Sequence, residues 1–405
     1  MPLCVLAVGI ALFSVETIGT DSFQTDCNNQ KSPYHFYDFC VYYSGGKIAV
    51  SPDRASIYDP AVQHRYLATV RNTDPMSVDT VVMQYPPFAA CLLIPLAMLS
   101  PNQAFAAWCL GSLAAYLAGF YLLSKMCFDT LGWWKKSIVA FALLGTLPVF
   151  ITTMLGQMSF FVFFLATAYF FCLYKNKNII GGVLLALSSF KPHYALFWAV
   201  PALGQRRWKL LAAAALTEAA LLVMACAVLG VEAVAKYPAL VLQSDNFSSN
   251  SEIEMLMISL RGLLVSTFNL PGVFPITAAI MAMALLLLVL VWWKAGKTTD
   301  PESFKNLAAA TVIICLFTSV HTFVYDALLL ILPAILILTS KQTASAGSQR
   351  FIVATLWATP YIQWLGLALL PYNLHRSLPT SLLLLALSAA MVLNLMPRLK
   401  KADKT

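Results

Sequence analysis

Long apolar runs alternate with short basic segments along most of the chain. The runs at 104–124, 210–230 and 273–293 reach the ~20 residues that a helix needs to cross ~30 Å of hydrocarbon. Their apolar character is continuous, whereas the strands of a membrane β-barrel alternate between apolar and polar positions. The pattern therefore predicts an all-α polytopic membrane protein. Further crossings are expected at 2–18, 137–153, 158–173, 306–320, 326–340, 351–369 and 378–396.

The composition supports this class and excludes others. Of the 405 residues, 60% are hydrophobic and only 11% are charged, which is too little charge to cover the surface of a soluble chain. The formal net charge of +8 is explained by an excess of Lys and Arg in cytoplasmic loops. No basic groove studded with aromatic residues occurs, so nucleic acid is excluded as a partner. The protein is expected to be embedded in the lipid bilayer.

The basic segments predict how the chain threads the membrane. The C-terminal tail, with Arg398 and Lys400, should be cytoplasmic, as should the segments around 175–177 and 206–209. One helix cannot join two cytoplasmic segments, and Lys191-Pro192 interrupts the apolar run between them. We therefore expect two short helices, at about 179–190 and 193–204, that meet at Lys191 on the outer side. With these two, the chain should make ~12 crossings, with both ends inside.

Two long segments are then expected outside. Residues 20–103 form a large first extracytoplasmic loop, and residues 231–272 form a second. The first contains a helix at 86–99, only 14 residues long, which we expect to dip into the membrane or lie along it. If it crosses, the sidedness of the following helices changes.

Short strings of chemically distinctive residues occur in order along the chain. They are YDFCVYY at 37–43, IYDP at 57–60, QYPPF at 84–88, LGQ at 155–157, GGVLLAL at 181–187 followed by Lys191-Pro192, QRRW at 205–208, and SVH at 319–321 with Tyr325-Asp326. Their order and spacing resemble glycosyltransferase family 87. These are the polyprenyl-phosphate-mannose-dependent mannosyltransferases of the GT-C superfamily. The similarity covers roughly residues 35–340.

The resemblance implies a GT-C-type bundle within one membrane-embedded domain. Residues 1–230 would form a catalytic module of about seven helices, and residues 231–405 would supply variable C-terminal helices. The active site would face outward from a bacterial inner (cell) membrane. The reaction would move a hexose, with mannose expected first and arabinose as the alternative, from a polyprenyl-phosphate sugar to an extracytoplasmic glycolipid or glycan.

Three residues are candidates for the chemistry. Asp38, in the aromatic YDFCVYY string, is the expected general base, and a helix-capping or solvated carboxylate is the alternative. Lys191 is the expected phosphate contact, because a lysine between apolar runs is costly unless it is used. A lysine that snorkels to a headgroup is its alternative. His321 would bind phosphate or orient the acceptor, with Asp326 fixing its tautomer, although the pair could also be a structural cap.

Other polar and aromatic residues are weaker candidates for substrate contacts. Gln157 could hydrogen-bond to sugar hydroxyls or be an ordinary interfacial amide, and Arg261 could contact phosphate. The remaining expected substrate contacts are Tyr42, Tyr58, Asp59 and Tyr85. The chain has no Asp-x-Asp pair, so we predict no metal and no other cofactor.

Two cysteines lie in the first outer loop, where the compartment is oxidising. Cys27 and Cys40 could therefore form a disulfide, although their spacing does not establish the required distance. A transporter or flippase for a lipid-linked substrate is the main alternative function, and it predicts repeat symmetry that the two halves do not show. A GT-C scaffold without catalysis remains a third reading.

Overall fold

The computed structural model describes residues 37–71, 83–128, 132–144, 146–247, 257–268, 272–296, 300–340, 381–390 and seven positions between 352 and 362. Throughout these residues the regular structure is helical, apart from an isolated β-bridge between Met257 and Phe323. The all-α prediction is confirmed. The expected helices at 2–18 and most of 351–369, together with the basic tail, lie outside the described residues.

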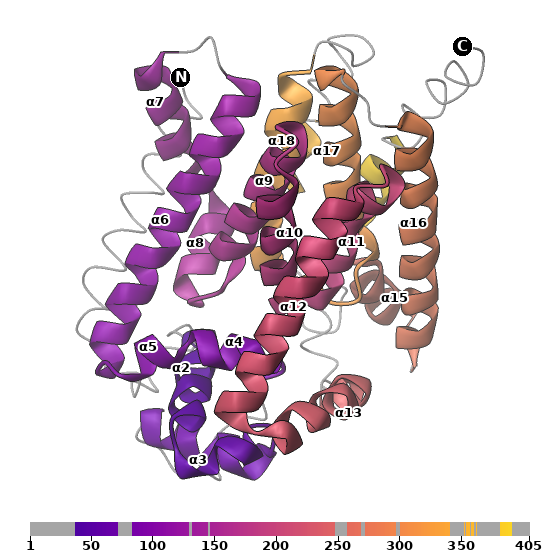
Figure 1. The fold of residues 1–405 in the computed structure, drawn as a ribbon. Helices are drawn as coiled ribbons and strands as arrows, with labels where there is room; N and C mark the ends of the chain where they lie inside the picture. Colours follow the sequence, from indigo (N-terminus) through magenta and orange to yellow (C-terminus); the bar gives the residue numbers. More distant parts are fainter. Residues whose placement is uncertain are drawn as a thin grey trace. The chain divides into compact units, whose positions relative to one another are not determined.

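Three described helices are long and apolar enough to cross a membrane. They are α6 (Pro101–Cys127), α12 (Trp208–Leu229) and α16 (Val273–Ala295), and they match three of the expected crossings (Figure 1). Each presents exposed leucines, such as Leu110 and Leu216, and extended apolar surface of this kind suits contact with lipid. The part of the chain that is described does not establish the expected count of ~12 crossings.

The chain divides into two compact units, each assembled from separate stretches of sequence. Unit 1 comprises residues 1–117, 139–161 and 216–249, and unit 2 comprises residues 118–138, 162–215 and 250–405. Both units draw on residues from either side of position 230. The expected boundary between a catalytic module and C-terminal helices stays a prediction.

Unit 1 shows that the described part of the first expected outer loop, residues 37–71 and 83–103, is largely helical. Its elements are α2 (Tyr37–Ala49), η2 (Pro52–Ser56), α3 (Pro60–Arg71), α4 (Pro87–Leu92), α5 (Ile94–Ala97), α8 (Leu147–Met154) and α13 (Val231–Phe247). Helix α2 packs against α3, α4 and α5 (Figure 1). Gly46 permits this approach, because a Cβ there would lie 2.8 Å from the Leu93 carbonyl oxygen.

Two expected helices are each broken into two, and proline explains both corrections. The segment 86–99 is not one helix, because α4 ends at Leu92 and α5 begins at Ile94. The segment 137–153 likewise consists of α7 (Trp133–Leu144) and α8. Pro95 and Pro148 lack the backbone N–H that would continue the preceding helix, and their rings disfavour it sterically. The described part of the second expected outer loop, 231–272, contains α13 and α15 (Leu260–Phe268).

Unit 2 contains the pair of short helices that the sequence predicts around Lys191. Helix α10 (Asn178–Leu187) continues as the 3-10 helix η4 (Ser188–Phe190), and α11 (Pro192–Gly204) begins directly after Lys191. Lys191 itself has φ −115° and ψ 86°, a non-helical conformation that its position before proline favours. The other elements of unit 2 include α9 (Ser159–Tyr174, mostly in this unit), α15, α16, α17 (Pro301–Thr318), η5 (Val324–Leu330) and α18 (Ile331–Leu338).

Several basic residues of unit 2 lie together at one end of the unit. The Tyr174 and Phe304 rings are 5.6 Å apart, the Gln205 amide donates to the Gly296 carbonyl over 3.2 Å, and the Arg206 guanidinium lies over the Trp293 ring. These contacts bring together the ends of α9, α11 and α16 and the start of α17. The basic residues at this end include Lys175, Lys177, Arg206, Arg207 and Lys305.

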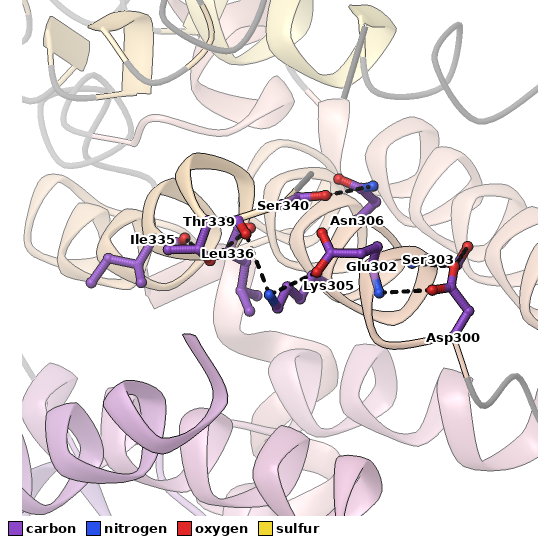
Figure 2. Close-up of polar contacts among 9 residues, drawn as sticks. All are labelled: Asp300, Glu302, Ser303, Lys305, Asn306, Ile335, Leu336, Thr339 and Ser340. Carbon is purple, nitrogen blue, oxygen red and sulfur yellow. Dashed lines mark hydrogen bonds and ion pairs between the residues drawn. The ribbon is translucent and has the colours of Figure 1, made fainter. Parts of the chain in front are cut away.

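At the same end, polar side chains join α17 to α18 (Figure 2). Asp300 caps α17 by accepting hydrogen bonds from the backbone N–H groups of Glu302 and Ser303. Lys305 donates to the Glu302 carboxylate over 3.1 Å and to the Thr339 carbonyl over 3.4 Å. The lysine thus satisfies a carbonyl at the end of α18, where a positive charge also complements the helix dipole.

The opposite end of unit 2 carries Lys191 and the connection from α17 to η5. The Lys191 ammonium contacts Asp326, and the Ile258 backbone N–H donates to the Thr322 carbonyl over 2.8 Å. Helix α11 has 13 residues, so its two ends are ~20 Å apart. Lys191 therefore lies away from the end that gathers the basic segments, as the sequence predicted.

Candidate functional site

Four side chains from three parts of unit 1 form a hydrogen-bonded group that we call the Asp38 cluster: Asp38, Tyr42, Tyr85 and Gln157. The Gln157 side-chain amide donates to Asp38 Oδ2 over 2.6 Å. The Tyr42 hydroxyl donates to Gln157 Oε1 over 2.9 Å and lies 3.0 Å from the Tyr85 hydroxyl. Three of the four residues were predicted as substrate contacts and the fourth as the base.

Helix geometry and one glycine bring these residues together. Asp38 lies in the first turn of α2, and Tyr42, four residues later, shares its face. Gly156 holds φ +62°, and a Cβ there would lie 2.7 Å from the Phe39 Cβ. Its carbonyl accepts a hydrogen bond from the Trp108 indole over 2.9 Å. Glycine therefore lets the LGQ string approach α2 closely enough for Gln157 to reach Asp38.

Aromatic rings surround the Asp38 cluster. The Tyr42 ring lies 5.6 Å from Trp108 and 5.3 Å from Tyr85. The Tyr58 hydroxyl donates to the Tyr85 carbonyl over 2.8 Å. Burial, with Tyr237 and Cys91 nearby, raises the pKa of Tyr58 well above its usual value, so this hydroxyl stays a neutral donor. Such amphipathic aromatic surfaces suit the apolar face and the hydroxyls of a sugar.

Asp59, by contrast, lies at the start of α3. Its carboxylate is exposed and accepts a hydrogen bond from the Ala61 backbone N–H over 2.9 Å. This contact is typical of a helix-capping aspartate. A capping role accounts for Asp59 without any contact to substrate.

A second group lies in unit 2, and we call it the Lys191 cluster: Lys191, Tyr194, Tyr325 and Asp326. The Lys191 ammonium lies 2.8 Å from Asp326 Oδ1, and the side chains are 7% and 1% exposed. The same ammonium lies 5.5 Å from the Tyr194 ring centre and 5.2 Å from that of Tyr325. These aromatic faces add cation–π attraction to the ion pair.

Asp326 forms an ion pair with Lys191. The expectation that Asp326 also fixes the tautomer of His321 stays a prediction. The other carboxylate oxygen of Asp326, Oδ2, accepts a hydrogen bond from the Phe323 backbone N–H over 3.2 Å. The carboxylate is therefore held by both a side chain and the turn that precedes η5.

Two histidines and an arginine lie beside the Lys191 cluster. The His193 and His321 rings are 6.4 Å apart. Arg261 is 2% exposed, and its guanidinium lies over the Phe274 ring. His321 lies in the connection between α17 and η5, where burial and the positive charges of Arg261 and Lys191 lower its pKa to about 3. This imidazole is therefore neutral at physiological pH.

His193 is the residue in this region that the sequence reasoning missed. It follows Lys191-Pro192 directly, in the first turn of α11, so its position beside the candidate lysine could have revealed it. Its Nε2 atom is buried and has no hydrogen-bond partner among the described residues, and the same is true of Ser319 Oγ. Buried polar atoms without partners are uncommon in folded proteins, and a bound ligand or water would satisfy them.

The Asp38 cluster lies in unit 1 and the Lys191 cluster lies in unit 2. The predicted disulfide is not tested, because Cys27 lies outside the described residues; Cys40 is 1% exposed.

The family model of glycosyltransferase family 87 matches residues 84–319, more than half of the chain. The protein belongs to glycosyltransferase family 87 and is a membrane glycosyltransferase, as the resemblance predicted. No curated protein and no solved structure matches the chain. The matched range includes Gln157, Lys191 and Arg261, whereas Asp38, His321 and Asp326 lie outside it. The roles of those three therefore depend on their own geometry.

Proposed function

We propose that the protein transfers a hexose, with mannose as the expected sugar, from a polyprenyl-phosphate donor to a glycolipid or glycan. In this proposal Asp38 is the general base and Lys191 contacts the donor phosphate. The reaction takes place on the extracytoplasmic face of a bacterial inner membrane. Family membership supports the class of reaction, and the buried Lys191 is the observation that carries the choice of donor.

The chemistry follows from these two roles. The Asp38 carboxylate takes the proton from the acceptor hydroxyl as its oxygen bonds to C1 of the sugar. The bond between C1 and the phosphate oxygen breaks at the same time, and the polyprenyl phosphate leaves with the bonding electrons. Direct displacement inverts the anomeric centre. A positive group beside the departing phosphate stabilises the charge that develops on it.

The surroundings of Lys191 support a phosphate ligand. A nearly buried ammonium between apolar helices is costly, and such residues usually serve an ionic or polar ligand. Arg261 adds a second buried cation to the region, and its planar guanidinium suits a phosphate. His193 and Ser319 offer buried polar atoms that a phosphate or a sugar hydroxyl could engage. A lipid carrier could bring this phosphate laterally from the bilayer.

The distribution of basic residues supports the proposed sidedness. Lys191 lies at the end of unit 2 opposite Lys175, Lys177, Arg206 and Lys305. Basic segments of membrane proteins are enriched on the cytoplasmic side. The Lys191 end would then face the extracytoplasmic side.

A transfer assay tests the proposal against a transporter. Membranes that contain the protein are supplied with polyprenyl phosphate carrying radiolabelled mannose and with a lipid extract as acceptor. We expect label in a new glycolipid, and we expect Lys191→Met to weaken donor binding and slow transfer. Lys177→Met, which removes an exposed lysine at the opposite end, should behave like the parent. Movement of labelled donor across the bilayer without a new glycosidic bond would favour the transporter and refute the proposal.

A further inference from the structure

We infer that Gln157 is a positioning residue that orients the carboxylate of Asp38. The inference depends on the proposed role of Asp38 as the general base. It assigns Gln157 a task within the protein, because the NH₂ group and the oxygen of its amide both hydrogen-bond to neighbouring groups.

The direction of each hydrogen bond follows from one backbone group. The Met158 backbone N–H lies 3.3 Å from Gln157 Oε1, and an N–H can only donate, so the carbonyl oxygen of the amide must face it. The NH₂ group then faces Asp38 Oδ2 at 2.6 Å. In the reverse orientation two donors would meet at Met158, and two acceptors would meet at Asp38. The local backbone therefore fixes which end of Gln157 reaches the base.

Tyr42 completes the arrangement at Oε1. Its hydroxyl donates to that oxygen over 2.9 Å, so its single proton is used and the Tyr85 hydroxyl must be the donor in the contact between the two tyrosines. Oε1 now accepts two hydrogen bonds, which fills its two lone pairs. Gln157 is only 3% exposed, and its oxygen has no capacity left for a sugar hydroxyl.

The hydrogen bond from Gln157 to Asp38 Oδ2 affects how the carboxylate can act as a base. A carboxylate is planar, so a hydrogen bond at Oδ2 restricts rotation of the group and sets the direction of Oδ1. A general base must lie within hydrogen-bond reach of the proton that it removes. Misplacement by ~1 Å can cost up to ~10²-fold in rate. Asp38 is half-buried at the start of α2, and its hydrogen bond to Gln157 restricts rotation of the carboxylate.

Other ionisable groups occur among the described residues of unit 1. Tyr42, Tyr85 and Tyr58 are joined to the cluster by the hydrogen bonds given above. Lys47 lies over the Tyr43 ring, nine residues along α2 and thus ~13 Å from Asp38. Asp53 and Arg65 pair with each other at 2.7 Å on η2 and α3, and His64 and Asp59 lie on or beside α3.

The test is the pH dependence of sugar transfer in Gln157→Glu. The new carboxylate keeps one oxygen for Met158 and Tyr42, so its other oxygen faces Asp38 Oδ2. Two carboxylates in contact share a proton and titrate as a coupled pair. We therefore expect the acidic limb of the pH–rate profile to move upward by at least about one pH unit, with activity recovering at higher pH.

Two further variants separate positioning from a structural role. Gln157→Leu removes the hydrogen bond, so we expect kcat to fall by up to ~10²-fold with the KM for the polyprenyl-phosphate donor unchanged. Gln63→Glu is the matched control, because Gln63 is another buried amide of unit 1 that binds backbone groups. Gln63→Glu should not shift the acidic limb of the pH–rate profile, even if it lowers the amount of folded protein.

The inference is overturned if folded Gln157→Glu keeps the parent profile. It is also overturned if Gln157→Leu raises the donor KM and leaves kcat intact, because that is the signature of a substrate contact. If Gln157→Glu does not fold, the result with Gln157→Leu decides. Asp38→Asn is measured alongside. If Asp38→Asn transfers sugar at the parent rate, the proposed base itself is wrong. If Asp38→Asn is inactive but the Gln157 variants behave like the parent, only the positioning role is refuted.

Discussion

Lys191 and Asp326 are 135 residues apart in the sequence, yet their charged atoms meet at 2.8 Å where both side chains are nearly inaccessible to solvent. Such a pair gains Coulomb energy but loses the hydration of both charges. Its net contribution to stability is therefore small compared with the penalty for removing one partner. The pair holds an ammonium in place beside two aromatic rings, where a phosphate could replace or share the carboxylate.

The Lys191–Asp326 ion pair predicts that the effects of the two substitutions on the free energy of unfolding are not additive in a double-mutant cycle. Asp326→Asn should lower the free energy of unfolding by about 3–5 kcal/mol, because it leaves Lys191 buried without its counter-charge. Lys191→Met together with Asp326→Asn should recover part of that loss, while sugar transfer stays low. Thermal unfolding in detergent measures the first effect and the transfer assay the second. If the double variant is as unstable as the sum of the two single variants, the side chains are not energetically coupled.

Gly156 should be intolerant of any side chain. Gly156→Ala would place a non-glycine residue at φ +62°, which costs about 1–2 kcal/mol, and would press its Cβ against Phe39, the neighbour of Asp38. We expect a lower melting temperature and slower transfer. Gly132→Ala is the control, since nothing lies within 4 Å of a Cβ at that position. Equal melting temperatures for the two variants would contradict the close approach of the LGQ string to α2.

His321 should make stability depend on pH. Its pKa is about 3 in the folded protein and about 6.5 when unfolded, so the unfolded chain binds the extra proton between these values. Stability is therefore lost as pH falls from 6.5 toward 3, by up to about 1.4 kcal/mol per pH unit from this residue. Unfolding of the parent and of His321→Asn across this range measures the difference. A variant as pH-sensitive as the parent would show that His321 does not remain neutral in the folded state.

Much of the fold could be predicted from the sequence, because the lengths of apolar runs and the positions of prolines have direct consequences. The sequence predicted the long apolar helices α6, α12 and α16 in this way, and also the break at Lys191-Pro192. Pro95 and Pro148 were overlooked because the apolar runs continue through them. Asp38 was expected in a loop, but the YDFCVYY string forms the start of α2. The apolar and aromatic side chains of residues 39–43 are buried there.

The partners within the candidate site were harder to predict. The sequence places Asp326 five residues after His321, but it does not reveal that Asp326 forms an ion pair with Lys191, 135 residues away. The contact of Gln157 with Asp38 spans 119 residues and depends on the backbone conformation at Gly156, which a list of residues does not contain. His193 directly follows a helix break, and the sequence does not show that its ring lies 6.4 Å from that of His321.

Sidedness can be tested with single cysteines in a background that lacks the native ones. Ser189→Cys, beside Lys191, should react with a membrane-impermeant thiol reagent added from outside. Lys177→Cys, at the end that gathers the basic segments, should react only when the cytoplasmic side is opened. The reason is the excess of basic residues at the Lys177 end. Labelling of Ser189→Cys only from the cytoplasmic side would reverse the proposed orientation.

The central claim is that Asp38 is the general base, and Asp38→Asn tests it most directly. The substitution keeps the shape of the side chain and removes the proton acceptor, so transfer of labelled mannose from polyprenyl phosphate should fall by about 10²- to 10⁴-fold. Donor binding should change little. Asp59→Asn makes the same chemical change at an exposed helix cap, where asparagine caps equally well, and it should match the parent. Transfer by Asp38→Asn within about threefold of the parent, in equal amounts of folded protein, would contradict the account, because a general base contributes far more than that.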